Sequence, residues 1–285
     1  MTDTRENKNA VFQQQTSAQQ GISAVERVKA EFGLDIPIEV VPLPSLGAVY
    51  PVGSPLHGRE TIEIRSMTAR EEDILTSRAL LKKGTVITEL IKSCMTDKSF
   101  EPSSLLIGDR NALLVAIRIT GYGHEYDVEM ECNECGVKSP RTFDLSQLPI
   151  KQLRIEPTQP GVNSFEFLLP YSKKVVNFRF MTGKDEEEIS TAQEKMKKAG
   201  FQTDSNVTTN LTYSIESIDG ITDRSKISNF VRSMPARDSL ALRSYIRENE
   251  PGIDMNQEVV CSACGHSEAV NMPLGTGFLW PTFDK

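Results

Sequence analysis

Several features that mark other classes of protein are scarce in this chain of 285 residues. No apolar run approaches the length of a membrane-spanning helix, and the N-terminus is polar rather than a basic stretch leading into an apolar signal region. Lys and Arg number 32 against 39 Asp and Glu, giving a formal net charge of −7. Because binding along a phosphate backbone needs clustered basic residues, this balance argues against nucleic acid. We expect a soluble protein in a reducing compartment, without a membrane or nucleic-acid partner.

Signatures of common catalytic and nucleotide-binding sites are also missing. The sequence has no Gly-x-x-x-x-Gly-Lys phosphate loop, no Gly-x-Ser-x-Gly elbow, no His-Glu-x-x-His pair and no dinucleotide glycine fingerprint after a strand. Its acidic clusters, at residues 71–73 and 185–188, lie at the expected starts of helices, where negative charge offsets the helix dipole. We therefore predict that the protein is not an enzyme.

Cysteine is scarce, but four of the five cysteines form two matched pairs. Two Cys-x-x-Cys-Gly turns, here called knuckles, contain Cys132, Cys135 and Gly136 in one case and Cys261, Cys264 and Gly265 in the other. Such a short turn lets both sulfurs face one ion while backbone amides hydrogen-bond to them, and the glycine suits a turn with positive φ. In a reducing compartment we predict that the four thiolates bind one structural Zn²⁺ ion.

Other interpretations of the cysteines remain open. His266, close to Cys264, could replace one ligand, although its counterpart in the first knuckle is Val137. A disulfide within each pair is a second alternative. A catalytic zinc site would keep one coordination position open for water, and four equivalent sulfurs leave none. Cys94 has no Cys or His near it in sequence, so we predict that it is a buried apolar side chain.

The sequence aligns with itself when it is shifted by 129 residues, a register that superimposes the two knuckles without a gap. Asp109 then falls on Asp238, and Arg118 falls on Arg247. Further upstream the match continues at a shift of 114, where residues 65–72 parallel residues 179–186 and a strand-like stretch runs into a Thr-x-x-acid capping box. A long period present twice indicates a duplicated unit of helix, strand, knuckle and strand.

Apolar spacing and proline content suggest how the chain is divided. Helical periodicity predicts a helix over residues 85–94 and a second apolar stripe that consists of Val207, Leu211, Ile215 and Ile218. Residues 1–36 read as a polar, Gln-rich N-terminal arm, with a short amphipathic helix near its end, that becomes ordered on another subunit. Residues 37–152 and 153–285 read as the first and second repeats, each with one knuckle. The predicted fold is α+β, with internally duplicated helix and β-hairpin units joined by a split four-cysteine zinc ribbon.

Several short strings of residues, in this order, resemble those of a known family. They are Leu43-Pro44-Ser45-Leu46-Gly47 with Tyr50-Pro51, Gly108-Asp109-Arg110-Asn111-Ala112-Leu113, the first knuckle, Ser217-Ile218-Asp219-Gly220, Met234-Pro235-Ala236-Arg237-Asp238-Ser239, Glu248-Asn249-Glu250-Pro251-Gly252-Ile253-Asp254, the second knuckle and Phe278-Leu279-Trp280-Pro281. Over about residues 40–282 the chain resembles the T-even-type baseplate hub proteins of contractile-tailed bacteriophages. The N-terminal arm lies outside this resemblance.

The resemblance implies a structural protein of the virion tail baseplate that is assembled in the host cytoplasm, in several copies per particle. Its implied partners are other baseplate proteins, namely hub, spike, tube-initiating or wedge subunits. The zinc would fix the angle between two similar lobes, making the protein a rigid bracket. Two competing classes are a zinc-ribbon factor associated with nucleic acid and a metallohydrolase.

Overall fold

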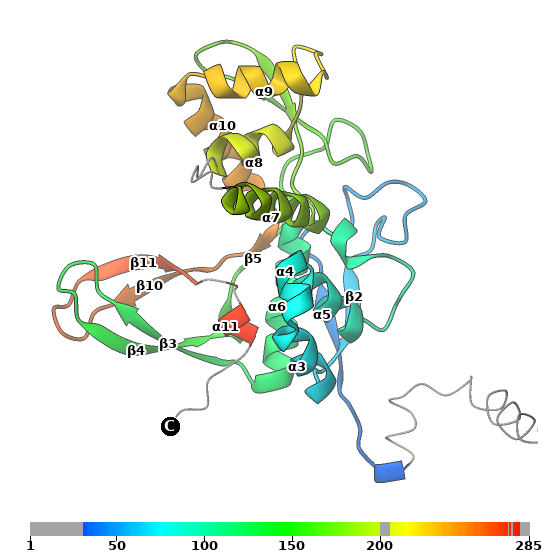
Figure 1. The fold of residues 1–285 in the computed structure, drawn as a ribbon, viewed down its shortest axis with the longest axis vertical. Coiled ribbons are helices and arrows are strands. Elements are labelled where there is room, and N and C mark those ends of the chain that lie inside the picture. Colours follow the sequence, from blue (N-terminus) through cyan, green and yellow to red (C-terminus); the bar gives the residue numbers. More distant parts are fainter. Residues whose placement is uncertain (1–30, 200–205, 273, 275, 280–285) are drawn as a thin grey trace, which may run out of the picture. The chain divides into compact units, whose positions relative to one another are not determined.

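The computed structural model describes residues 31–199, 206–272, 274 and 276–279 (Figure 1). The chain divides into two compact units, residues 1–38 and residues 39–285, and the second holds nearly all of the described elements. Most of the helix predicted near the end of the N-terminal arm lies outside the described residues, as does Trp280. None of the described helices is both long and apolar enough to cross a membrane.

The first part of the larger unit is a strand pair followed by three short helices. They are β1 (Ile38–Pro42), β2 (Thr61–Arg65), α3 (Ala69–Thr76), α4 (Arg78–Lys83) and α5 (Val86–Cys94). β1 and β2 form a two-stranded sheet. A capping box starts α3, because Thr68 and Glu71 satisfy each other's backbone N–H groups. Gly84, with a φ of +69°, ends α4 in the left-handed conformation that favours glycine.

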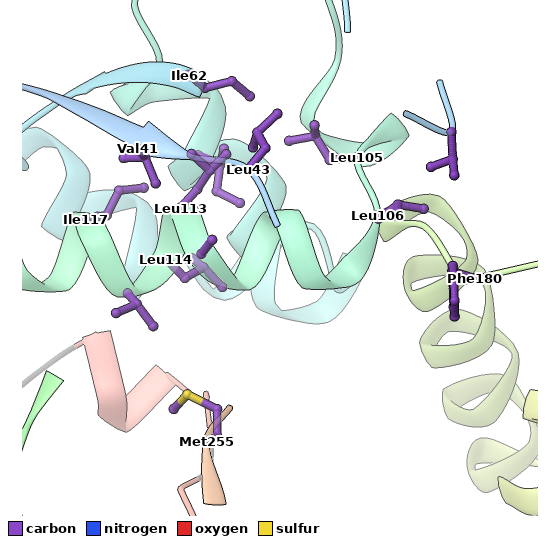
Figure 2. Packing of buried hydrophobic residues seen from close by; sticks show 14 of the residues in the cluster. Val41, Leu43, Ile62, Leu105, Leu106, Leu113, Leu114, Ile117, Phe180 and Met255 are labelled. Carbon is purple, nitrogen blue, oxygen red and sulfur yellow. The ribbon is translucent and has the colours of Figure 1, made fainter. Parts of the chain in front are cut away.

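The long helix α6 (Ile107–Tyr122) is central to the first half of the fold. The short 3₁₀ turn η1 (Pro102–Ser104) precedes it, and the hairpin of β3 (Glu125–Glu131) and β4 (Lys138–Asp144) follows it, ending in the 3₁₀ turn η2 (Leu145–Gln147). Leu113 and Ile117 of α6 are fully buried. Figure 2 shows them on the side of the helix that faces Val41 and Leu43, with Met255 from the far end of the chain on the other side.

The second half also has a strand pair, then helices, then a knuckle-bearing hairpin, but an additional strand stands among its helices. Its elements are β6 (Phe165–Leu168), β7 (Val175–Phe178), α7 (Gly183–Lys198), α8 (Asn206–Ser214), the additional strand β8 (Ile215–Ile218), α9 (Arg224–Ser233), α10 (Ala236–Asn249), β10 (Asn256–Val260) and β11 (Ser267–Asn271). β6, β7 and β8 form an antiparallel sheet, and β10 pairs with β11 in a second knuckle-bearing hairpin. Helices and small antiparallel sheets are thus combined in an α+β fold.

Equivalent bonds occur in the two halves at the offsets found in the sequence. Arg65 pairs with Glu71 of the first capping box, and 114 residues later Arg179 pairs with Asp185 of the second. Both carboxylates also accept the backbone N–H of their N-cap threonine. The repeat in the sequence therefore corresponds to a repeat in the hydrogen bonds. The division at residues 152 and 153 stays a prediction, since residues 39–285 form one compact unit.

Asp109 and Asp238, aligned at a shift of 129, hold matching loops. Asp109 is buried in the first turn of α6 and accepts hydrogen bonds from the Ser45 backbone N–H at 2.9 Å and the Tyr50 hydroxyl at 2.5 Å. Asp238, in the first turn of α10, accepts the Tyr171 backbone N–H at 2.7 Å. Each aspartate therefore anchors the connection between the first two strands of its half.

The C-terminal part of the chain returns to pack on the first half. β9 (Gly252–Ile253) pairs with β5 (Ile150–Lys151) and lies against α6. A Cβ on Gly108 of α6 would lie 1.7 Å from the Pro251 carbonyl oxygen, so this close approach requires glycine. The short helix α11 (Thr276–Leu279) also packs on α6. One continuous hydrophobic core results, and it contains side chains from both halves.

The predicted helical stripe of the second half is wrong beyond Ser214. α8 ends there, and Ile215 and Ile218 belong to strand β8. β8 pairs with β7, so pairing within the sheet overrides the helical spacing of these residues. Val207, at the start of the stripe, is exposed.

Candidate metal centre

Each knuckle is the turn of a hairpin, and its local structure is set by backbone hydrogen bonds. The Gly136 N–H donates to the Cys132 carbonyl at 2.9 Å, and the Gly265 N–H donates to the Cys261 carbonyl at the same distance. Both glycines have positive φ, +69° and +73°. The Cys-x-x-Cys-Gly spacing therefore predicts the local turn correctly, because only a residue without a Cβ adopts this conformation easily.

The tips of the two hairpins bring all four knuckle cysteines together. The Cys132 and Cys264 sulfurs are 3.8 Å apart, as are those of Cys135 and Cys261, and all four lie within 4.8 Å of one another. Each close pair takes one sulfur from each hairpin, across 132 and 126 residues of sequence. Four sulfurs about 2.3 Å from one zinc ion would be separated by about 3.8 Å along each tetrahedral edge. The geometry thus fits a four-thiolate site.

Disulfides do not account for this cluster. All five cysteines are free thiols, so neither knuckle contains a disulfide. The first cysteine of each knuckle is buried and the second is exposed. His266 is not a member of the cluster, and its backbone carbonyl instead accepts the Cys261 N–H at 2.8 Å.

The pKa values of the cysteine thiols indicate whether the four sulfurs can ionise together without a cation. Backbone N–H groups of Cys264 and Ala263 lower the pKa of the Cys261 thiol to about 6, which favours a thiolate. The backbone at His266 lowers the pKa of Cys264, but desolvation and the neighbouring sulfurs outweigh it and raise that pKa to about 12. One thiolate therefore forms readily, and its charge opposes ionisation of the others. A divalent cation would remove this opposition, so the donor set fits a metal ion.

Below the knuckles the inner faces of the two hairpins face each other across a narrow gap. Met130 and Arg141 line it from the first hairpin, and Val259 and Val270 line it from the second. At the tips the Asn133 side chain donates a hydrogen bond to the Glu268 carboxylate, which links the two hairpins directly. Contacts of the protein itself thus help to hold the two hairpins together beside the four sulfurs.

The base of the first hairpin is fixed by Arg118, a role that the sequence did not reveal. Its guanidinium donates to three backbone carbonyls, those of Phe278 at 3.1 Å, Gly123 at 2.9 Å and Glu125 at 3.1 Å. Tyr126 packs edge to face on Phe278, with ring centroids 5.2 Å apart. The Arg118 side chain, from α6, thus connects this helix to β3 and α11. In the sequence Arg118 stood out only because it aligns with Arg247, and that alignment indicated the repeat but not the hydrogen bonds to these carbonyls.

Other cysteine and polar positions lie outside the centre. Cys94 is fully buried in the core, as predicted. Where α5, α6 and α7 meet, Arg110 donates to the Thr88 hydroxyl at 3.1 Å, and Thr88 donates to the Glu187 carboxylate. These residues join the two halves through buried polar groups. Sequence spacing did not predict them, because the partners come from three separate helices.

Fold and site together define an α+β protein in which two hairpins of a duplicated chain meet at four cysteines. A comparison with protein families matches residues 43–276 to the T4 bacteriophage base plate protein family. Because the match covers most of the chain, this protein belongs to that family. Neither a curated protein nor a solved structure matches it. Membership supports a structural role in a phage baseplate, among other baseplate proteins.

Proposed function

We propose that this protein is a bracket in the hub region of a contractile-tail baseplate, held in shape by one structural Zn²⁺ ion. The observation that carries the proposal is the meeting of Cys132 and Cys135 with Cys261 and Cys264 within 4.8 Å. Each hairpin belongs to a different half of the chain, so an ion bound to all four sulfurs would fix the two hairpins relative to each other. All four tetrahedral positions would be filled by sulfur, which favours a structural over a catalytic role.

Metal analysis tests the zinc assignment directly. Protein purified without chelator should contain about one zinc per chain, with sulfur coordination by X-ray absorption. Serine in place of Cys132 or Cys264 should lower the content well below one. A matched control is Glu134→Ser, which changes an exposed residue of the same knuckle. Zinc bound equally by the cysteine variants and the control would refute the four-cysteine site.

The hub location and the arm form the second part of the proposal. Residues 1–36 would grip a neighbouring hub, spike, tube-initiating or wedge subunit, and several copies would be present per particle. Tagged protein recovered from infected cells should carry baseplate proteins, and deletion of residues 1–33 should reduce their recovery. A cryo-EM map of the particle that places the chain in the outer baseplate would contradict the hub assignment. Unchanged assembly after the deletion would contradict the arm.

Charge on the hairpins disfavours the alternative of a zinc-ribbon factor that binds nucleic acid. The outward side chains of β3 are Glu125, Asp127, Glu129 and Glu131, all exposed. A row of four carboxylates would repel a phosphate backbone. A DNA titration at several salt concentrations should therefore show no binding. The metallohydrolase alternative would require an activity that disappears when zinc is removed from protein that stays folded.

A further inference from the structure

Apolar side chains alternate where the described chain begins, and all of them are exposed except Ile36, which is half-buried. Phe32, Leu34, Ile36, Ile38 and Val40 occupy every second position, separated by Gly33, Asp35, Pro37 and Glu39. A period of two is typical of a strand with one covered face. Here the exposed fraction is 71% for Phe32, 60% for Leu34 and Ile38, and 56% for Val40. The sequence pattern thus predicts an apolar strand face, and the described residues do not cover most of it.

The backbone of this segment becomes strand β1 at Ile38 and has a free edge there, whereas residues 33–37 just before it belong to no helix or strand. β1 pairs with β2 in a two-stranded sheet, so its other side has no strand beside it in the described part of the chain. The Leu43 N–H donates to the Glu60 carbonyl at 2.7 Å, which places the odd-numbered backbone groups toward β2. Because these directions alternate in an antiparallel strand, the N–H and C=O groups of Ile38 and Val40 point to the open edge. Exposed edges of this kind are templates for adding a strand.

We propose that residues 34–38 pair antiparallel with the same residues of a second copy of this chain, about a two-fold axis at Ile36. In this register Ile36 faces Ile36 of the second copy, and Leu34 faces Ile38. Within residues 34–38 every apolar side chain then has an apolar cross-strand neighbour, since the order of residue types from Leu34 to Ile38 is symmetric about Ile36. A two-fold interface requires this kind of self-complementary surface.

The positions of the charged residues and of proline favour the register centred on Ile36 over the one centred on Pro37. With the axis at Ile36, Asp35 faces Pro37 and Glu39 faces Gly33, so no two carboxylates meet. Centring the pairing on Pro37 would place Asp35 opposite Glu39, and like charges directly opposite are destabilising. Pro37 has no N–H, but its odd position turns that gap toward the β2 side, away from the new ladder. Gly33, with a φ of +68°, bends the chain and ends the ladder at Leu34.

The expected contact is small, which sets its strength. A ladder of about five residues falls below the roughly 1,200 Å² of a standard stable interface, so we expect association in the range of about 10 to 100 µM. Several copies held in one particle would experience a much higher effective concentration. The pairing goes beyond the proposed bracket and does not rest on zinc, since the knuckle cysteines and the strand are different parts of the chain.

Crosslinking through one cysteine added to the full chain tests the register. Cα atoms of a hydrogen-bonded antiparallel pair are about 5.5 Å apart, within the range for a disulfide. Ile36→Cys should therefore give a covalent dimer under mild oxidation at least about tenfold faster than Ile38→Cys alone, because two copies of residue 38 are offset along the ladder. Leu34→Cys mixed with Ile38→Cys should crosslink nearly as fast as Ile36→Cys. Wild-type protein supplies the background from the native cysteines.

Sedimentation equilibrium gives an independent measurement. Wild-type protein at about 100 µM should contain dimer, and Ile38→Lys should be monomeric at the same concentration. Because Ile38 is 60% exposed, an unchanged circular dichroism spectrum is expected and would show that folding is intact. Equal crosslinking rates for Ile36→Cys and Ile38→Cys, or a wild type that stays monomeric, would overturn the proposal. Either failure leaves the zinc content and the recovery of baseplate proteins to be judged separately.

Discussion

Replacing Cys261 by serine should reveal how much the proposed zinc clasp stabilises the fold. Cys135 and Cys261 are 126 residues apart in sequence, yet their sulfurs lie 3.8 Å from each other. Closing a loop of that length costs about 4 kcal/mol of chain entropy. The fold itself already bears this cost, because β5 pairs with β9 and Asn133 reaches Glu268 between the hairpins. Zinc binding should therefore be tight and its free energy should appear as stability.

The magnitude follows from mass action. Free zinc buffered at 100 to 1,000 times the dissociation constant stabilises the native state by about 2.7 to 4.1 kcal/mol. For a chain of this size each kcal/mol shifts Tm by roughly 2 to 4 °C, so Cys261→Ser should melt roughly 5 to 16 °C below the wild type.

Calorimetry in a zinc buffer at pH 7 measures this difference, with Glu134→Ser as the control that should melt with the wild type. A chelator should lower the wild type to the Tm of Cys261→Ser and leave the variant almost unchanged. The reasoning fails if the variant and the wild type melt within about 1 °C of each other in buffered zinc. It also fails if the chelator lowers both by the same amount.

Three further predictions concern the body of the fold. Burial alone would raise the pKa of Glu71, but hydrogen bonds from Arg65, Ser93 and Thr68 lower this pKa to about 2. The stabilisation that the Glu71 carboxylate gives is therefore present above pH 4.5 and is lost as the pH falls toward 2. Glu71→Gln should destabilise the protein by about 2 to 3 kcal/mol at pH 7 and make acid denaturation, followed by circular dichroism, less steep. Burial raises the pKa of Glu250 to about 7, although the positive charge of Lys151 lowers it slightly, so the native state loses stability as the pH rises from about 4.5 to 7. In urea titrations Glu250→Gln should be more stable than the wild type by about 2 kcal/mol at pH 8 and equal to it at pH 4. Equal stability of the two proteins at both pH values would contradict this prediction. Gly108→Ala would place a methyl group 1.7 Å from the Pro251 carbonyl oxygen and should lower the free energy of unfolding by about 2 to 4 kcal/mol. Gly121→Ala, in the same helix, meets only the flexible Met67 side chain and should lower it by less than about 1 kcal/mol. Similar urea midpoints for the two variants would refute the close-packing argument.

Local signals in the sequence were reliable wherever a short stretch carries its own structure. The Thr-x-x-acid pattern predicted two capping boxes, and both form, at Thr68 and at Thr182. The knuckle glycines predicted positive φ, and Gly136 and Gly265 have it. These features depend on groups within a few residues of each other, so no distant part of the chain can easily change them.

Signals that required a distant partner were less reliable. The spacing from Val207 to Ile218 predicts a helix, but the edge of β7 takes the last four residues as a strand. Periodicity cannot distinguish a buried helix turn from a short buried strand when the partner is forty residues away. The N-terminal segment shows the reverse case, because its period of two is visible in the sequence, whereas only the structure shows that the described residues do not cover most of its apolar side chains.

By itself the sequence determined the two knuckles, their duplication and the two capping boxes related by a shift of 114, because each depends on residue type and short spacing. That the sulfurs of Cys132 and Cys264 lie 3.8 Å apart was decided by the tertiary structure. The same holds for Arg118, which donates hydrogen bonds to the backbone carbonyls of Gly123, Glu125 and Phe278. These contacts depend on how the C-terminal chain packs against α6, and that packing is a property of the whole core rather than of any segment.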